Sequence, residues 1–154
     1  MSIPDLPPLF VEGYTDKLSY TPGETVGFHI STSSSQYSIE IARLGAQRQV
    51  FWQRGQIPGT CHPIPDDASS HGCRWPCELT LEIPADWPSG YYEATLQIED
   101  DGGNFHGRNQ RRAQGIFHFV VRPARPGQNT PILLQLATNS YNAYNNWGGW
   151  SLYS

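Results

Sequence analysis

The stretch YTDKLSYTPGETVGFHIS, residues 14–31, carries the clearest combination of turn and strand signals in the chain. Proline fixes φ and glycine permits positive φ, so Pro22 and Gly23 predict a tight turn. The residues after the turn alternate between two faces, with Val26, Phe28 and Ile30 on one and Gly27, His29 and Ser31 on the other. This period of two predicts a strand whose first face is buried and whose second face lies in water.

Short alternating runs of this kind recur along most of the chain, separated by turn residues among its 13 prolines and 15 glycines. They predict strands at residues 9–13, 25–31, 37–43, 49–53, 78–83, 91–99 and 115–121. Many such strands with turns between them indicate an all-β, Ig-like antiparallel sandwich. The stretch at 14–31 also resembles the opening of many Ig-like and macroglobulin-type sandwiches.

Length and charge limit what the protein does. A chain of 154 residues suits one domain of ordinary size, which we place at residues 1–122. The net charge of −4 provides no basic field for nucleic acid or an anionic membrane, so we expect neither partner. The N-terminus has no pattern of a secretion signal and no apolar run is long enough for a bilayer, so we expect a cytoplasmic protein.

A long loop at residues 54–77 interrupts the strand pattern and gathers several nitrogen and sulfur donors. The donors are Cys61, His62, His71, Cys73 and Cys77. They are candidate zinc ligands, but the spacing contains neither a CxxC nor an HxxxH pair. A disulfide with one remaining thiol is a second interpretation. Unligated loop residues are the third, and the poor spacing favours it.

The C-terminal residues have a different composition. A proline-rich linker at 123–130 precedes PILLQLA, residues 131–137, which reads as a strand buried on both faces of a parallel sheet. Residues 139–154 are rich in tyrosine, tryptophan and asparagine, and no charged residue occurs from 126 to 154. Solvated tails are seldom so aromatic, so we expect this segment to be covered. Residues 131–154 are therefore predicted to be the first strand and active-site loop of an α/β domain.

The string PILLQLATNSYNAYNNWGGWSLY, residues 131–153, resembles the beginning of the catalytic domain of the N,N-dimethylformamidase large (beta) subunit family. The similarity continues backwards through FHFVVRPARPG, residues 117–127, and IPADWPSGYYEATL, residues 83–96. The resemblance implies hydrolysis of a small amide such as dimethylformamide in a glutamine amidotransferase-like α/β domain. It also implies one iron ion, Fe3+, held by two tyrosine phenolates and a glutamate, which are hard oxygen ligands suited to this ion.

Residue by residue, the resemblance makes Tyr144 the candidate metal ligand, with Tyr141 and Tyr153 as competitors. The candidate substrate-pocket residues are Asn139, Tyr141, Asn145, Trp147, Gly148 and Gly149. The second tyrosine and the glutamate have no counterparts here, so iron is expected to be shared with a partner chain or with downstream sequence. The chain would then be a subunit or part of a hetero-oligomeric amidohydrolase, active only when assembled. The alternative is a non-enzymatic Ig-like binding or assembly module that docks through its aromatic tail.

Overall fold

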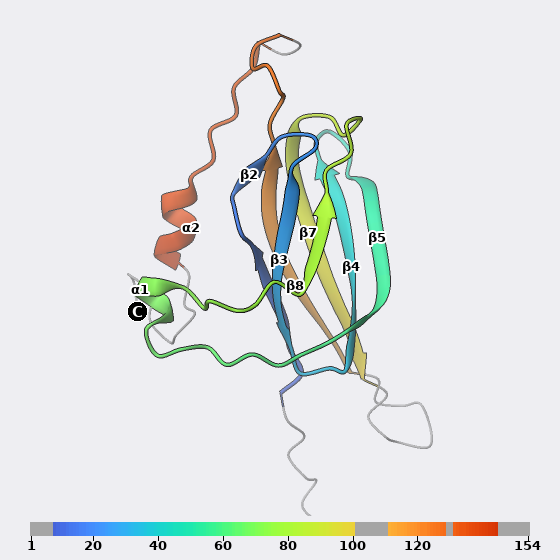
Figure 1. Cartoon of the computed structure of the whole chain (residues 1–154), viewed down its shortest axis with the longest axis vertical. Coiled ribbons are helices and arrows are strands. Elements are labelled where there is room, and N and C mark those ends of the chain that lie inside the picture. Colours follow the sequence, from blue (N-terminus) through green and yellow to red (C-terminus); the bar gives the residue numbers. More distant parts are fainter. Residues whose placement is uncertain (1–7, 101–110, 129–130, 145–154) are drawn as a thin grey trace, which may run out of the picture.

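The computed structural model describes residues 8–100, 111–128 and 131–144, which form a two-layer β-sandwich with two short helices (Figure 1). The strands are β1 (Val11–Thr15), β2 (Ser19–Tyr20), β3 (Thr25–Thr32), β4 (Gln36–Leu44), β5 (Gln49–Pro58), β6 (Leu79–Glu82), β7 (Gly90–Asp100) and β8 (Arg111–Val121). The helices are α1 (Ala68–His71) and α2 (Thr138–Tyr144). Every predicted strand range up to residue 121 overlaps one of these strands, which confirms the all-β sandwich.

The small sheet has the order β1-β3-β6, and the large sheet has the order β2-β8-β7-β4-β5. All pairings are antiparallel except that of β2 with β8. The small sheet corresponds to strands A, B and E of an immunoglobulin fold, and β4, β7 and β8 correspond to C, F and G. Strand D would lie between β5 and β6, where the described residues form the long loop and α1 instead.

The core lies between the sheets and follows from the predicted alternation. On β7 the inward side chains are Tyr92, Ala94, Leu96 and Ile98, and all of them are buried. The Tyr92 ring stacks on Trp87 at a centroid distance of 5.0 Å, and its hydroxyl donates to the carbonyl oxygen of Pro88 at 2.7 Å. A tyrosine at the start of strand F that bonds back to the preceding corner is typical of Ig-like sandwiches.

The turn predicted at Pro22-Gly23 is present and is of type II. Gly23 has φ +86, and the Glu24 amide donates to the Thr21 carbonyl oxygen at 3.0 Å. The Glu24 carboxylate also accepts a hydrogen bond from the Thr21 hydroxyl at 2.9 Å. The turn therefore closes on itself before the chain enters β3.

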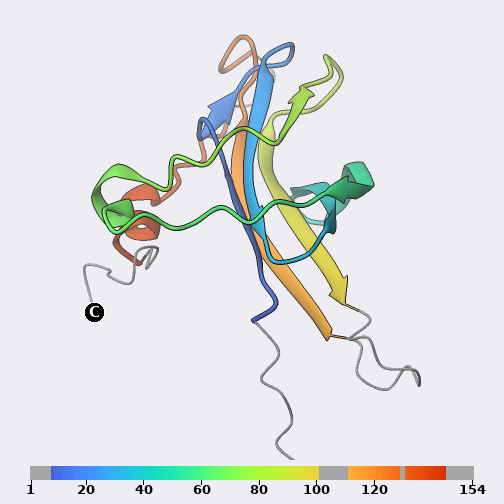
Figure 2. The same cartoon turned by 60° about the horizontal axis from the view of Figure 1, so that its bottom comes forward.

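The second face of β3, predicted to lie in water, is covered by the loop between β5 and β6. Figure 2 shows this loop crossing the small sheet on its way to α1 and back. Ser31 is buried and exchanges two hydrogen bonds with the main chain of His62, at 2.8 and 3.0 Å. His29 Nδ1 donates to the Trp75 carbonyl oxygen at 2.7 Å, and the Trp75 amide donates to the Tyr14 hydroxyl at 3.0 Å. The prediction was wrong because alternation within a strand does not show what a distant loop covers.

Just beyond β8 the Arg122 amide still donates to the Tyr20 carbonyl oxygen of β2, at 2.7 Å. Residues 122–128 and 131–137 form no helix or strand, and α2 follows. Figure 1 shows the chain rising above the end of β8 and returning down the side of the sandwich to α2. Within the described ranges, neither helix has the length and apolar character needed to cross a membrane.

Candidate functional site

The apolar residues at the start of the C-terminal segment, residues 131–144, are open to solvent. Ile132, Leu133 and Leu134 are 80%, 91% and 69% exposed. Three adjacent exposed aliphatic side chains make a contiguous patch, and such patches usually mark an interaction surface. Residues 131–137, expected to be a strand, form neither helix nor strand in the structure, and the α/β domain to which they were assigned stays a prediction.

Residues 138–144, expected as an active-site loop, are helical. The amides of Ser140 and Tyr141 both donate to the Ala137 carbonyl oxygen, at 3.0 and 3.2 Å, and this begins α2. Residues three apart lie on one side of a helix, so Tyr141 and Tyr144 are neighbours on its surface. They are 55% and 70% exposed, whereas Ala143 between them is buried.

The other predicted site residues divide into two groups. Asn139 lies in the first turn of α2 and is exposed. Asn145, Trp147, Gly148 and Gly149, together with the competing ligand Tyr153, lie outside the described residues. The structure therefore places Asn139, Tyr141 and Tyr144 on one short helix, and the predictions for the remaining pocket residues stand as predictions.

Tyr91 on β7 was not identified by the sequence analysis. Burial raises the pKa of Tyr91 to about 12, and the Tyr141 hydroxyl adds to this rise. The Tyr91 ring stacks on His118 of β8 with a centroid distance of 4.8 Å and an interplanar angle of 20°.

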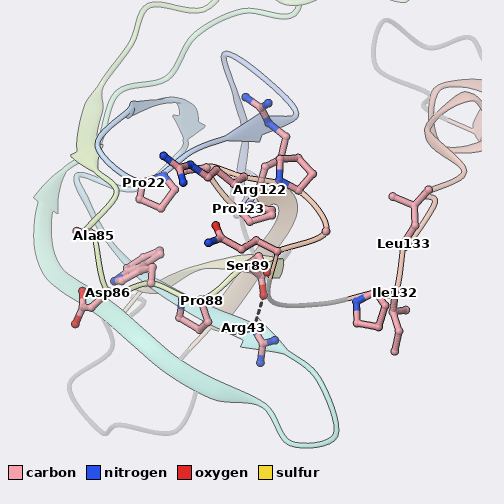
Figure 3. Close-up of a pocket in the computed structure, with 17 residues that line it drawn as sticks. Pro22, Arg43, Ala85, Asp86, Pro88, Ser89, Arg122, Pro123, Ile132 and Leu133 are labelled. Atoms are coloured by element: carbon pink, nitrogen blue, oxygen red, sulfur yellow. Dashed lines mark hydrogen bonds between the residues drawn. The ribbon is translucent and has the colours of Figure 1, made fainter.

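A hollow of about 990 Å³ lies at the base of the C-terminal segment. It is bounded by the corner before β7, the linker after β8 and the first residues of the exposed apolar patch. Figure 3 shows Ile132 and Leu133 on one side of it and Ala85 and Asp86 on the opposite side. Arg43 projects into the corner, where its Nε donates to the Ser89 carbonyl oxygen at 3.1 Å. Of the predicted substrate-pocket residues that the structure describes, neither Asn139 nor Tyr141 lines this hollow.

The five candidate zinc ligands of the long loop are not brought together. Within the described ranges, no three His, Cys, Asp or Glu side chains are grouped so that they could hold a metal ion. Cys61 and Cys77 are exposed, Cys73 is buried, and all three are free thiols, so no disulfide forms. His62 Nε2 lies 2.6 Å from Glu78 Oε1, and His71 Nδ1 lies 2.8 Å from the Ser70 hydroxyl. Each of these two histidines therefore has a neighbouring side chain within hydrogen-bond distance.

The described residues fit an iron site only as one side of it. The Tyr144 phenolic oxygen is a hard donor, and the side chain that carries it is 70% exposed. Within residues 131–144 the sequence contains no carboxylate or histidine, so α2 cannot supply a complete ligand set.

Comparisons with known proteins identify one family. Residues 38–154 match the family described as N,N-dimethylformamidase beta subunit-like, C-terminal. No curated protein matches the chain. Among solved structures, Spo0M, the sporulation control protein of Bacillus subtilis, is 14% identical with a TM-score of 0.37, over 75% of this chain and 49% of that one. The chain thus spans about half the length of Spo0M, and a likeness this weak bears on neither fold nor function.

Proposed function

The chain belongs to the N,N-dimethylformamidase beta subunit-like family, and from this we propose that it forms one part of a hydrolase of small N-substituted amides. The match to the family carries the proposal, because it runs from β4 through the whole C-terminal segment to residue 154. A match confined to the sandwich would have supported only a shared fold.

The exposed apolar patch supports assembly with further protein. Burying an aliphatic side chain contributes roughly 1.5–3 kcal/mol, so covering Ile132, Leu133 and Leu134 would stabilise a complex by several kcal/mol. A parallel sheet buries both faces of its strands, and residues 131–137 have the composition for that position. The partner in this proposal is the rest of an α/β catalytic domain, on a second chain or in downstream sequence.

Tyr144 is the residue that we assign to the metal. Its side chain is the more exposed of the two tyrosines on α2. Bound iron would supply a Lewis acid that polarises the amide carbonyl. In this proposal the chain holds the Tyr144 oxygen at the edge of the site, and the Asn139 amide, about 1.4 helical turns earlier on α2, orients a substrate carbonyl.

Assembly and hydrolysis can be tested together with one exposed leucine and a matched control. The chain is produced with its downstream or neighbouring α/β sequence, and complex formation and amine release from dimethylformamide are measured. Leu133→Asp should abolish both, because it places a charge where a sheet must form. Leu18→Asp changes a sandwich residue that is 64% exposed and should leave both intact.

The outcome also decides between hydrolase and binding module. A complex that forms through Leu133 and yet releases no amine from any small N-substituted amide would support the docking module and overturn the hydrolase. Normal assembly of the Leu133→Asp variant would show that the exposed patch is not the contact surface.

A further inference from the structure

The hollow at the base of the C-terminal segment has walls that the chain itself holds in place. On the side of the corner before β7, Trp87 is buried and stacks on Tyr92 at a centroid distance of 5.0 Å. On the side of the linker, Gly127 has φ +80 and the Gln128 amide donates to the Arg125 carbonyl oxygen at 3.4 Å, which closes a type II turn. Both walls also contain prolines, whose fixed φ restricts the main chain. The shape of the hollow therefore does not depend on a bound partner.

The charged side chains around this hollow are mainly positive. Arg43, Arg122 and Arg125 line it, and Asp86 is the one carboxylate among the described residues that do so. The chain has a net charge of −4 and ten Lys and Arg residues, so three of these ten gather at one place in an acidic protein. A local excess of positive charge favours a partner surface that carries carboxylates.

Contacts within the chain leave much of this positive charge available. Arg43 Nε donates to a main-chain carbonyl oxygen at 3.1 Å, which holds the side chain without neutralising its charge. Arg122 Nη2 lies 3.6 Å from Glu24 Oε2, and the same carboxylate lies 3.3 Å from Lys17 Nζ. Arg125 is exposed, and the turn fixes the main chain that carries it. Guanidinium groups pair well with carboxylates, often through two parallel hydrogen bonds.

The hollow continues into the exposed apolar patch. Ile132 and Leu133 belong to the patch and also line the hollow, so protein that covers the patch reaches the edge of the hollow (Figure 3). The volume of about 990 Å³ far exceeds what an inorganic anion needs, since one molecule of liquid water takes up about 30 Å³. The space therefore suits a segment of polypeptide better than a small ion.

We propose that an acidic segment of the α/β protein that covers the exposed apolar patch fills this hollow, and that its carboxylates pair with Arg125 and Arg122. The patch supplies most of the binding free energy, whereas the charges set the orientation in which the partner docks. This docking rests on the assembly proposed above and requires neither the metal nor hydrolysis.

Amide hydrogen exchange in the assembled protein tests the docking at Ala124 and Gly127, which line the hollow. Protection of their amides should rise at least about tenfold over that in the chain alone. Arg125→Glu should lower this protection by about 3- to 30-fold, because it replaces an attraction by a repulsion. Arg125→Lys should retain most of it. The control Arg54→Glu makes the same change of charge at an exposed position of β5 outside the hollow and should retain all of it.

Two results would overturn the docking. Exchange that is unchanged on assembly would show that the hollow stays open, and full protection in Arg125→Glu would show that its occupant is not acidic. Protection that rises with the concentration of the chain alone would also overturn it, because a second copy would then fill the hollow.

Amine release from dimethylformamide, measured on the same samples, separates the docking from the proposed function. A covered hollow without hydrolysis retains the acidic segment and rejects the hydrolase. Hydrolysis with an open hollow retains the hydrolase and rejects the acidic segment.

Discussion

Two buried tyrosines of the sandwich differ in one respect that makes them a sharp test of the structure. Tyr20 and Tyr37 are 0% and 3% exposed. The Tyr20 hydroxyl donates to Asp16 Oδ1 at 2.7 Å and accepts from the Lys17 amide at 2.9 Å. The Tyr37 hydroxyl is buried without a hydrogen-bond partner among the described residues. Tyr20→Phe therefore removes a hydroxyl that makes two hydrogen bonds, whereas Tyr37→Phe removes a buried hydroxyl that makes none with the described residues.

The expected changes in the free energy of unfolding have opposite signs. A hydrogen bond to a charged group contributes about 1.5–3 kcal/mol, so Tyr20→Phe should destabilise the sandwich by about 2 kcal/mol. Asp16 keeps a bond from the Gly27 amide at 2.7 Å, which places this value toward the lower end. A buried hydroxyl without a hydrogen bond destabilises the folded state by about 1–3 kcal/mol, so Tyr37→Phe should stabilise the sandwich by about 1 kcal/mol. The two variants should therefore differ by about 3 kcal/mol.

Urea unfolding monitored by circular dichroism measures both variants under one set of conditions. Equal slopes would show that the same surface is exposed on unfolding, and the midpoints would then give the difference. In thermal unfolding, about 3 kcal/mol corresponds to roughly 6–12 °C in Tm for a chain of this size. Equal losses in the two variants would refute the reasoning, because they would mean that the Tyr37 hydroxyl has a partner in the folded protein.

Three further substitutions probe the turn, the core and the loop. Hydrogen bonds from Thr21 lower the pKa of Glu24 from 4.5 to about 2. The ionised carboxylate therefore stabilises the folded protein above pH 4.5, and this stability is lost as the pH falls toward 2. In Glu24→Gln, the free energy of unfolding measured by urea titration should fall less steeply over that pH range. Gly115→Ala should cost about 2 kcal/mol in the same assay, because its Cβ would collide with the Val11 carbonyl oxygen. Trp75→Ala should cost about 3 kcal/mol and make the loop before β6 the first site of limited proteolysis.

Most strands of the sandwich were predictable because at least one of their faces is buried. Residues with period-two alternation, such as Val26 and Phe28 on β3, were placed correctly on the buried side. The extension of β5 to Pro58 was missed because most of its residues are exposed and show no alternation. The burial of Ser31 was not predicted, because it depends on contacts with a loop about thirty residues farther along the chain.

The lack of charge and the aromatic composition led the sequence analysis to predict a site within residues 131–154, and the structure shows that the first of these residues are exposed. The helical state of Tyr144 was missed because asparagine and tyrosine are weak helix formers.

The central claim is that this chain contributes Tyr144 to a metal site completed by other protein. The most direct measurement is the iron content per assembled complex in the wild type, in Tyr144→Phe and in the control Tyr37→Phe. The account predicts that iron and amide hydrolysis are both lost in Tyr144→Phe and retained in Tyr37→Phe. Normal iron content in a correctly assembled Tyr144→Phe complex would contradict it.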